Sequence, residues 1–319
     1  MAESSEGRSC PLAYRYDPTG LCQAPEMVTA DVLYIVGGLY GNPCALDEIE
    51  RMARQEAEQG RSVQLVFNGD FNWFNASDEL FRDINTRLQA YTVSLGNVEY
   101  ELANPVPGAG CGCAYPEQVA QQVVERSNRI MTRLQGLAGK HPDILEWLRQ
   151  LPRYRCLVFG GLRILVLHGD PESLAGWGLS RESFSIENDF CHRGWFRKTG
   201  ADIIASSHTC EPALWSGSVD GRPRVIVNNG SAGMANLQGD TRGLITRIAL
   251  DPSGDNPVAC VDAAGVAVSL QPVAFGLTAW LDRFDRIWPA GSDAALSYRQ
   301  RMTAGTSLLP GQLQFPDTP

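Results

Sequence analysis

The chain has 319 residues and a mass of 34.8 kDa, and its 27 Lys and Arg against 36 Asp and Glu give a formal net charge of −9. This acidic balance argues against a protein that binds nucleic acid or an anionic membrane through a broad basic face. Hydrophobic residues make up 44% and charged residues 20%, which excludes a mostly disordered chain. No apolar run approaches the roughly 18 residues that a membrane helix needs.

The sequence predicts three parts: an extended N-terminal arm (1–28), one layered α/β domain (29–273), and a C-terminal helix and tail packed on that domain (274–319). Buried strands are expected at 31–37 and 63–67, because both are short apolar runs rich in β-branched residues. Each is followed by the apolar spacing of an amphipathic helix. Alternating strands and helices at the start, with consecutive strands later, indicate a layered α/β sandwich.

The middle of the domain is expected to begin with a short strand at 91–95 and a long helix that starts near Pro116. A second helix at 143–151 leads into a β-hairpin built from two apolar runs on either side of Gly160 and Gly161. Later strands are expected at 201–205, 224–227 and 244–250 and in a hairpin over 258–273, followed by a helix at 278–287 and an irregular end from 308.

Polar residues follow five of the predicted strands, where sites form in open α/β sheets. Four of these loops carry a group that can bind a metal: Asp70, Asn97, His168 and His208. Each residue alone is more often structural, but two imidazoles, one carboxylate and one amide oxygen together suit Zn²⁺, Mn²⁺ or Fe. We therefore expect a divalent metal ion, about one per chain.

The order of these loops resembles that of the calcineurin-like metallophosphoesterases over about residues 30 to 250. The matching segments are Gly38–Asn42, Gly69–Asp70, Gly96–Glu99, His168–Gly169 and Ser207–Cys210. The resemblance implies a four-layer α/β/β/α sandwich and, for 29–273, a metallophosphoesterase-like domain. It also implies two metals around a bridging hydroxide, one of them held by the four residues named above.

The chain departs from the family pattern at five positions. Gly38 and Tyr40 stand where the family has a ligating Asp and His, and Cys210 replaces the second His of the last segment. Val98 replaces a His that commonly protonates the leaving group, and Trp73 replaces an Asp. The resemblance thus implies one intact metal site beside one that is lost or remodelled. Tyr40 and Cys210 either fill the space of the missing ion or hold a softer metal.

Two acidic residues and a cysteine pair complete the candidate site. Glu99, the acidic residue that ends the Gly96–Glu99 segment, and Asp170, which follows the His168–Gly169 segment, are expected as proton donors. Cys111 and Cys113 lie in a Pro/Gly-rich loop that, by resemblance, borders the mouth of the site. They are either structural or a thiol or metal-binding pair.

The resemblance and the retained set of four ligands imply a metal-dependent phosphoesterase-like hydrolase that acts on a small phosphorylated substrate through metal-activated water. The alternative is a catalytically inactive protein of the same fold that binds a metal, a ligand or a partner, and a weaker third possibility is thiol chemistry. No nucleic acid or membrane partner is expected, and the oligomeric state stays open. Nine cysteines without a visible signal peptide predict reduced thiols in a cytoplasmic protein.

Overall fold

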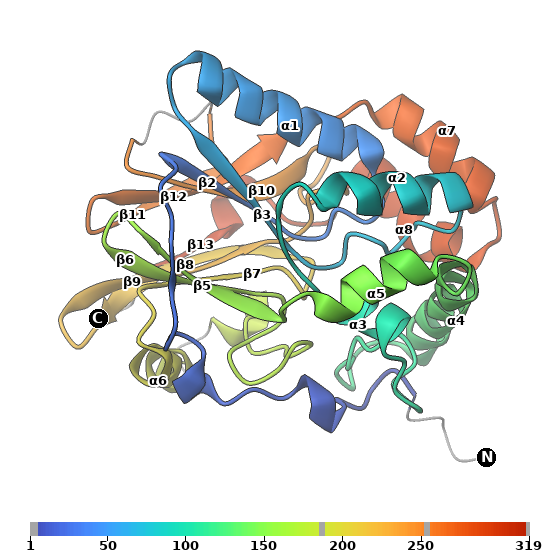
Figure 1. Ribbon diagram of the computed structural model, residues 1–319, viewed down its shortest axis with the longest axis horizontal. Helices are drawn as coiled ribbons and strands as arrows, with labels where there is room; N and C mark the ends of the chain where they lie inside the picture. The colour runs from blue at the N-terminus through green and yellow to red at the C-terminus, as the bar shows by residue number, and fades with distance from the viewer. Residues whose placement is uncertain (1–5, 185–188, 252–255, 317–319) are drawn as a thin grey trace.

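A computed structural model describes residues 6–184, 189–251 and 256–316, and it consists of two β-sheets packed face to face with helices on their outer faces (Figure 1). The ends of the expected arm and tail, 1–5 and 317–319, therefore lie outside the described residues. Among the described residues, no helix combines the length and apolar character needed to cross a membrane.

The first sheet has six strands and contains the first predicted strands of the domain. These strands are β2 (Val32–Val36), β3 (Val63–Asn68), β4 (Thr92–Ser94), β10 (Gly243–Ala249), β11 (Ala259–Ala263) and β12 (Val266–Val273). Their order in space is β11-β12-β10-β2-β3-β4, and β2, β3 and β4 run parallel to one another. The carboxyl ends of these three strands therefore meet at one edge of the sheet.

The second sheet has seven strands. They are β1 (Glu26–Met27), β5 (Tyr154–Phe159), β6 (Leu162–Leu167), β7 (Ile203–Ser206), β8 (Pro212–Val219), β9 (Arg222–Asn229) and β13 (Gln314–Pro316). Their order is β1-β5-β6-β7-β9-β8-β13, in which β6, β7 and β9 are parallel and β5 and β6 form the predicted antiparallel hairpin. The carboxyl ends of β6 and β7 carry the two histidine loops of the candidate site.

Eight α-helices are described. They are α1 (Pro43–Glu58), α2 (Asp78–Leu88), α3 (Asn97–Ala103), α4 (Gln121–Ala138), α5 (Pro142–Gln150), α6 (Asp189–Thr199), α7 (Leu277–Ile287) and α8 (Asp293–Ala304). Helices α1, α2 and α7 lie over the outer face of the six-stranded sheet, and α6 lies over the seven-stranded sheet (Figure 1). The remaining helices gather at one end of the molecule, with α8 packed against α4.

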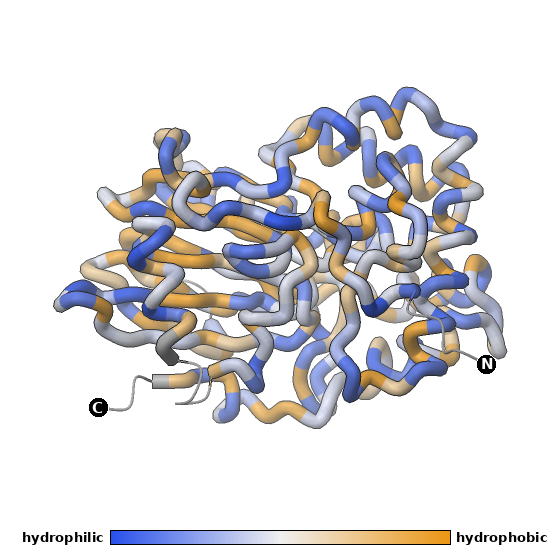
Figure 2. Tube along the Cα trace, turned by 90° about the horizontal axis from the view of Figure 1, so that it is seen from below, coloured by the Kyte–Doolittle hydropathy of each residue, from blue (hydrophilic) through white to orange (hydrophobic). Residues whose placement is uncertain are grey.

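Successive side chains of a strand in the six-stranded sheet pack into two different hydrophobic clusters, one on each face of the sheet. In β2, Val32 and Tyr34 pack on the side covered by helices, whereas Leu33 and Ile35 pack between the two sheets. Successive side chains of a strand point to opposite faces, so a strand buried on both faces reads as a continuous apolar run. Figure 2 shows the hydrophobic residues gathered along the central strands, with polar residues on the outer turns.

The fold is the expected α/β/β/α sandwich, and the structure differs from the predicted elements at particular places. The long helix expected from Pro116 begins at Gln121, because 116–120 form a turn before the helix. Helices α3, α6 and α8 and strands β1 and β8 were not predicted. The end of the chain, expected to be irregular, contains β13, which pairs in parallel with β8.

Candidate metal centre

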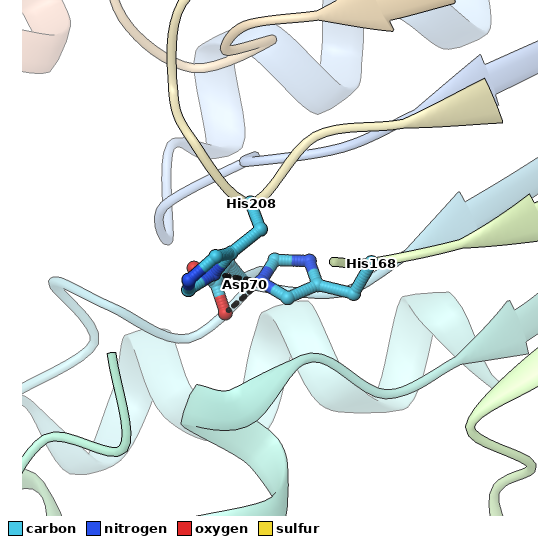
Figure 3. Close-up of side chains that lie close together, drawn as sticks. All are labelled: Asp70, His168 and His208. Carbon is cyan, nitrogen blue, oxygen red and sulfur yellow. Dashed lines mark hydrogen bonds and ion pairs between the residues drawn. The ribbon is translucent and has the colours of Figure 1, made fainter. Parts of the chain in front are cut away.

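The four predicted ligands come from four strand ends and converge at the common edge of the two sheets. Asp70 follows β3, Asn97 begins α3 after β4, His168 follows β6, and His208 follows β7. Figure 3 shows Asp70, His168 and His208 pointing toward one another, and a donor atom of each lies within 4.8 Å of the others. Every one of the four side chains is buried.

His168 is oriented by a backbone carbonyl. Its Nδ1 lies 3.0 Å from the carbonyl oxygen of Asn68, and because a carbonyl only accepts, Nδ1 carries the proton in the neutral ring. The unprotonated Nε2 then faces Asn97 Oδ1 at 3.0 Å and Asp70 Oδ1 at 3.3 Å. The amide of Asn97 is fixed in this orientation, since its Nδ2 donates to the carbonyl of Cys111.

His208 is oriented in the same way from the opposite side. Its Nε2 lies 3.1 Å from the carbonyl oxygen of Cys113, which places the proton of the neutral ring on Nε2. The unprotonated Nδ1 then faces His168 Nε2 at 3.1 Å. Two imidazole lone pairs, a carboxylate oxygen and an amide oxygen thus surround one point, and a positive charge is needed there to make the arrangement favourable.

A divalent metal ion fits this donor set. Imidazole nitrogens whose second ring nitrogen bonds to a carbonyl are the usual form of histidine metal ligands, and mixed N/O sets suit Zn²⁺, Mn²⁺ or Fe²⁺. Electrostatics in the unliganded cluster also call for a positive charge at this point. Burial together with the adjacent His168 lowers the pKa of His208 to about 3, which keeps this ring neutral and its lone pair free. Burial raises the pKa of Asp70 and lowers that of His168, but the attraction between the two groups outweighs burial, so the net pKa of Asp70 is lowered and that of His168 is raised. Without an ion, a proton on His168 supplies the positive charge that a bound metal would supply.

Glu99, expected as a proton donor, has its carboxylate surrounded by backbone N–H groups. Its carboxylate accepts hydrogen bonds of 2.8–3.0 Å from the backbone N–H groups of Asp70, Phe71, Asn72 and Gly96. Burial, with a further contribution from the charge of Asp70, raises the pKa of Glu99 to about 7. This arrangement favours a role in positioning the loop that carries Asp70.

Asp170 is likewise occupied by backbone donors. Its carboxylate accepts from the N–H groups of Glu172 and Ser173 at 2.9 Å and of Gly178 at 3.0 Å. Burial raises the pKa of Asp170 above its ordinary value. The residue therefore organises the loop 170–178, and neither Asp170 nor Glu99 lines the cavity described below.

Tyr40 and Cys210, the two residues that the resemblance associates with a lost or remodelled second metal site, contact each other. The Tyr40 hydroxyl lies 2.6 Å from Cys210 Sγ, and burial raises the pKa of both groups, that of Cys210 to about 11, so both are neutral at pH 7. A Cβ placed on Gly38 would lie 3.0 Å from Cζ of Tyr40 and 3.1 Å from its hydroxyl oxygen. The tyrosine ring thus occupies the space beside Gly38, which favours the space-filling interpretation of this pair.

Cys111 and Cys113 are buried, and both are free thiols. Burial raises the pKa of Cys113 well above its ordinary value. Among the described residues, the clustered metal-binding groups are Asp70, His168 and His208, without a cysteine. The two cysteines instead contribute their carbonyl groups, which orient Asn97 and His208.

A cavity of about 260 Å³ opens beside the cluster and is reached by Asp70 and His208. Its walls are mostly apolar and include Val98 and Trp73, two of the positions at which the chain departs from the family pattern. Sequence reasoning missed three further wall residues: Arg126, Trp177 and Tyr298. Arg126 lies on α4 and Tyr298 on α8, and neither helix contains a segment that matches the family pattern. No local sequence signal could therefore identify these two residues.

No protein-family model and no curated protein matches the sequence. Among solved structures, a hypothetical protein from Pyrococcus horikoshii has a TM-score of 0.56 at 15% identity, over 87% of this chain and 99% of its own. A metallophosphoesterase from Sphaerobacter thermophilus has a TM-score of 0.54 at 16% identity, over 87% of this chain and all of its own.

These similarities and the two-sheet architecture define the fold as that of a metallophosphoesterase. The expected likeness to the calcineurin-like enzymes is confirmed at this level. The buried Asp/His/His cluster is a candidate site for a divalent metal within that fold.

Proposed function

We propose that the protein is a metal-dependent phosphoesterase that hydrolyses a small phosphate ester with a single divalent ion. The observation that carries this proposal is the convergence of Asp70, Asn97, His168 and His208 beside a cavity large enough for a small ester. The unprotonated nitrogens of the two histidines face the same point, which suits metal binding better than structural hydrogen bonding.

In this proposal the four side chains hold Mn²⁺, Fe²⁺ or Zn²⁺. The ion, when bound, lowers the pKa of a water molecule and polarises a phosphoryl oxygen. The carbonyl groups of Asn68 and Cys113 fix the tautomers of the histidines, and Glu99 holds the Asp70 loop in place. These contacts keep the donor atoms converged, which is the contribution that the chain itself makes to the chemistry.

The neutral Tyr40–Cys210 pair is expected to affect the rate of hydrolysis, because it does not supply the positive charge of a second metal ion. A second cation would stabilise the charge that develops on phosphorus, and its loss costs several kcal/mol of transition-state stabilisation. We therefore expect slower turnover than in a two-metal enzyme, by orders of magnitude.

A second candidate is a catalytically inactive protein that binds a metal, a ligand or a partner. One observation favours it: among the described residues that line the cavity, Asp70 is the sole carboxylate and His208 the sole histidine. Outside the metal cluster, the acidic groups of the cavity are tyrosine hydroxyls and cysteine thiols, which are weak acids for protonating an alkoxide leaving group.

Hydrolysis assays separate the two candidates. The purified protein is loaded with Mn²⁺, Fe²⁺ or Zn²⁺ and tested on a phosphomonoester and a phosphodiester. Turnover by the wild type that is lost in Asp70→Asn and His208→Gln, but kept in the surface variant Asp83→Asn, supports the phosphoesterase. Metal binding without turnover of either ester supports the inactive binding protein.

A further inference from the structure

The cavity beside the metal cluster is small and bounded by elements from distant parts of the chain. Its volume is about 260 Å³, and its walls come from α4, α8 and the loops that hold Tyr115 and Trp177. A cavity of about 150 Å³ holds a benzene molecule. The space therefore suits one aromatic ring with a phosphoryl group. A long polymer would not fit inside it.

Arg126 is the cationic side chain of this cavity. It projects from α4, is half-buried, and its Nε donates to Ser297 Oγ of α8 at 2.8 Å. Among the described residues, no carboxylate pairs with it, whereas Arg129, one turn further along α4, pairs with Asp293 at 2.7 Å. The outer guanidinium nitrogens of Arg126 are thus available for an anion, and guanidinium is well suited to phosphate oxygens.

Aromatic rings form other parts of the cavity wall. The Trp177 Nε1 donates to the carbonyl of Cys113 at 2.9 Å, which fixes its ring edge-on to His208 with centroids 5.4 Å apart. Tyr298 of α8 lies edge-on to Trp73 with centroids 6.3 Å apart. Rings held in this way offer a flat apolar surface at little entropic cost, and they favour an aromatic partner over an aliphatic one.

The weak acids of the cavity point to the same kind of molecule. Among the described cavity residues, the carboxylate and the histidine both belong to the metal cluster, and the remaining acidic groups are tyrosine hydroxyls and cysteine thiols, which are poor donors to a leaving alkoxide at neutral pH. An aryl oxide is a much weaker base, because the pKa of a phenol lies near that of tyrosine, about 10. It can leave without being protonated in the transition state.

We infer that the cavity binds aryl phosphate esters, with the ring between Trp177 and Tyr298 and a phosphoryl oxygen on Arg126; the catalytic part of this inference rests on the proposed function. In hydrolysis, the oxygen of water bonds to phosphorus and the bond from phosphorus to the aryl oxygen breaks. The aryl oxide leaves with the electron pair and takes a proton from solvent, while the water releases its proton to solvent.

Binding to the metal-free protein tests the ligand class without any turnover. We expect phenylphosphonate to bind at least about tenfold more tightly than methylphosphonate in isothermal titration calorimetry. Both compounds carry the same phosphonate group, so the ratio reports the contribution of the ring. Equal affinities, or no measurable binding of phenylphosphonate, would overturn the inference.

Three variants assign the contacts. Arg126→Gln should weaken phenylphosphonate binding about tenfold, whereas the matched change Arg129→Gln on the same helix should leave it unchanged. Tyr298→Leu, which keeps an apolar side chain, should reduce the preference for phenylphosphonate over methylphosphonate. Unchanged binding in Arg126→Gln, or an equal loss in both arginine variants, contradicts the assignment.

Turnover is measured separately on the Mn²⁺-loaded protein with phenyl phosphate and benzyl phosphate, which differ chiefly in the basicity of the leaving oxygen. Faster hydrolysis of phenyl phosphate supports both proposals, and equal rates overturn the leaving-group argument. If neither ester is hydrolysed but the preference for phenylphosphonate holds, the proposed function fails and the ligand class stands.

Discussion

Nε2 of His168 and Nδ1 of His208 face each other at 3.1 Å, each with its other ring nitrogen bonded to a backbone carbonyl. Neither atom can donate to the other while both rings are neutral. The carbonyl groups of Asn68 and Cys113 therefore leave the two inner nitrogens of the neutral rings free to bind a cation between them.

Metal removal should therefore destabilise the protein. Because a ligand that binds only the folded state stabilises it, an ion at 100 times its dissociation constant adds about 2.7 kcal/mol. Chelation should lower the midpoint of thermal unfolding, and added Mn²⁺ or Zn²⁺ should restore it. His208→Gln should abolish the response to added metal; a response as large as that of the wild type would contradict the assignment of this ligand.

Glu99 should contribute to stability through its two acceptor oxygens. Glu99→Gln keeps the shape of the side chain but turns an amide N–H toward backbone donors that now bond to a carboxylate. We expect a loss of about 3 kcal/mol in the free energy of unfolding, measured with urea. Glu79→Gln, an exposed control in the first turn of α2, should change it by less than about 0.5 kcal/mol. Equal effects of the two changes would refute the positioning role.

The Tyr40 ring should make Gly38 intolerant of a side chain. Gly38→Ala should cost about 2 kcal/mol through contact with the ring and its positive φ of 64°. Gly60→Ala is a matched control, because its φ is also positive, at 81°, but an added Cβ meets nothing within 4 Å. Combining Gly38→Ala with Tyr40→Ala should reveal a coupling of about 1 kcal/mol in unfolding experiments, and strict additivity would contradict the contact.

A buried ion pair predicts how stability depends on pH. Arg247 Nε donates to Glu56 Oε1 at 2.8 Å, and Arg61 also bonds this carboxylate. Burial raises the pKa of Glu56, but the two arginines outweigh it and bring the net pKa below the ordinary value of 4.5. A folded-state pKa below that of the unfolded chain means that the pair stabilises fully above pH 4.5, and that this contribution is lost as the pH falls through the lowered pKa.

Replacement of that glutamate isolates its contribution. Glu56→Gln leaves Arg247 buried without its carboxylate and should cost about 3 kcal/mol at pH 7. The difference from the wild type should begin to shrink below pH 4.5, where the unfolded wild-type chain takes up the proton, and should be lost once the pH has fallen through the lowered pKa of the folded carboxyl. A difference that stays constant between neutral and acidic pH would contradict this account.

The sequence predicted the sandwich because its strands are buried on both faces. Val32–Val36 is a continuous apolar run, and Val63–Asn68 is apolar apart from Gln64 and Asn68, so both can be recognised without tertiary context. The four ligands could be predicted because each lies in a loop that follows a predicted strand and because the order of these loops resembles that of a known family. Helix α8 was missed because its apolar residues do not form a clear stripe, and β13 is only three residues long.

The parts of the site that the sequence did not predict depend on contacts between distant segments. Glu99 and Asp170 carry the carboxyl group that a proton donor needs. The backbone N–H groups that donate to these carboxylates are brought into place only by the folded loops. Arg126 belongs to the cavity because α8 packs against α4, and its hydrogen bond to Ser297 spans 171 positions of the chain. Such a contact has no local sequence pattern.

The most direct test is the metal content of the purified protein, measured by mass spectrometry of the elements after dialysis against buffer containing Mn²⁺ or Zn²⁺. The account predicts about one tightly bound ion per chain in the wild type. Asp70→Asn and His168→Gln should each retain almost none, while Asp83→Asn keeps the full amount. A wild-type protein without a bound ion, or ligand variants that retain it, would contradict the central claim.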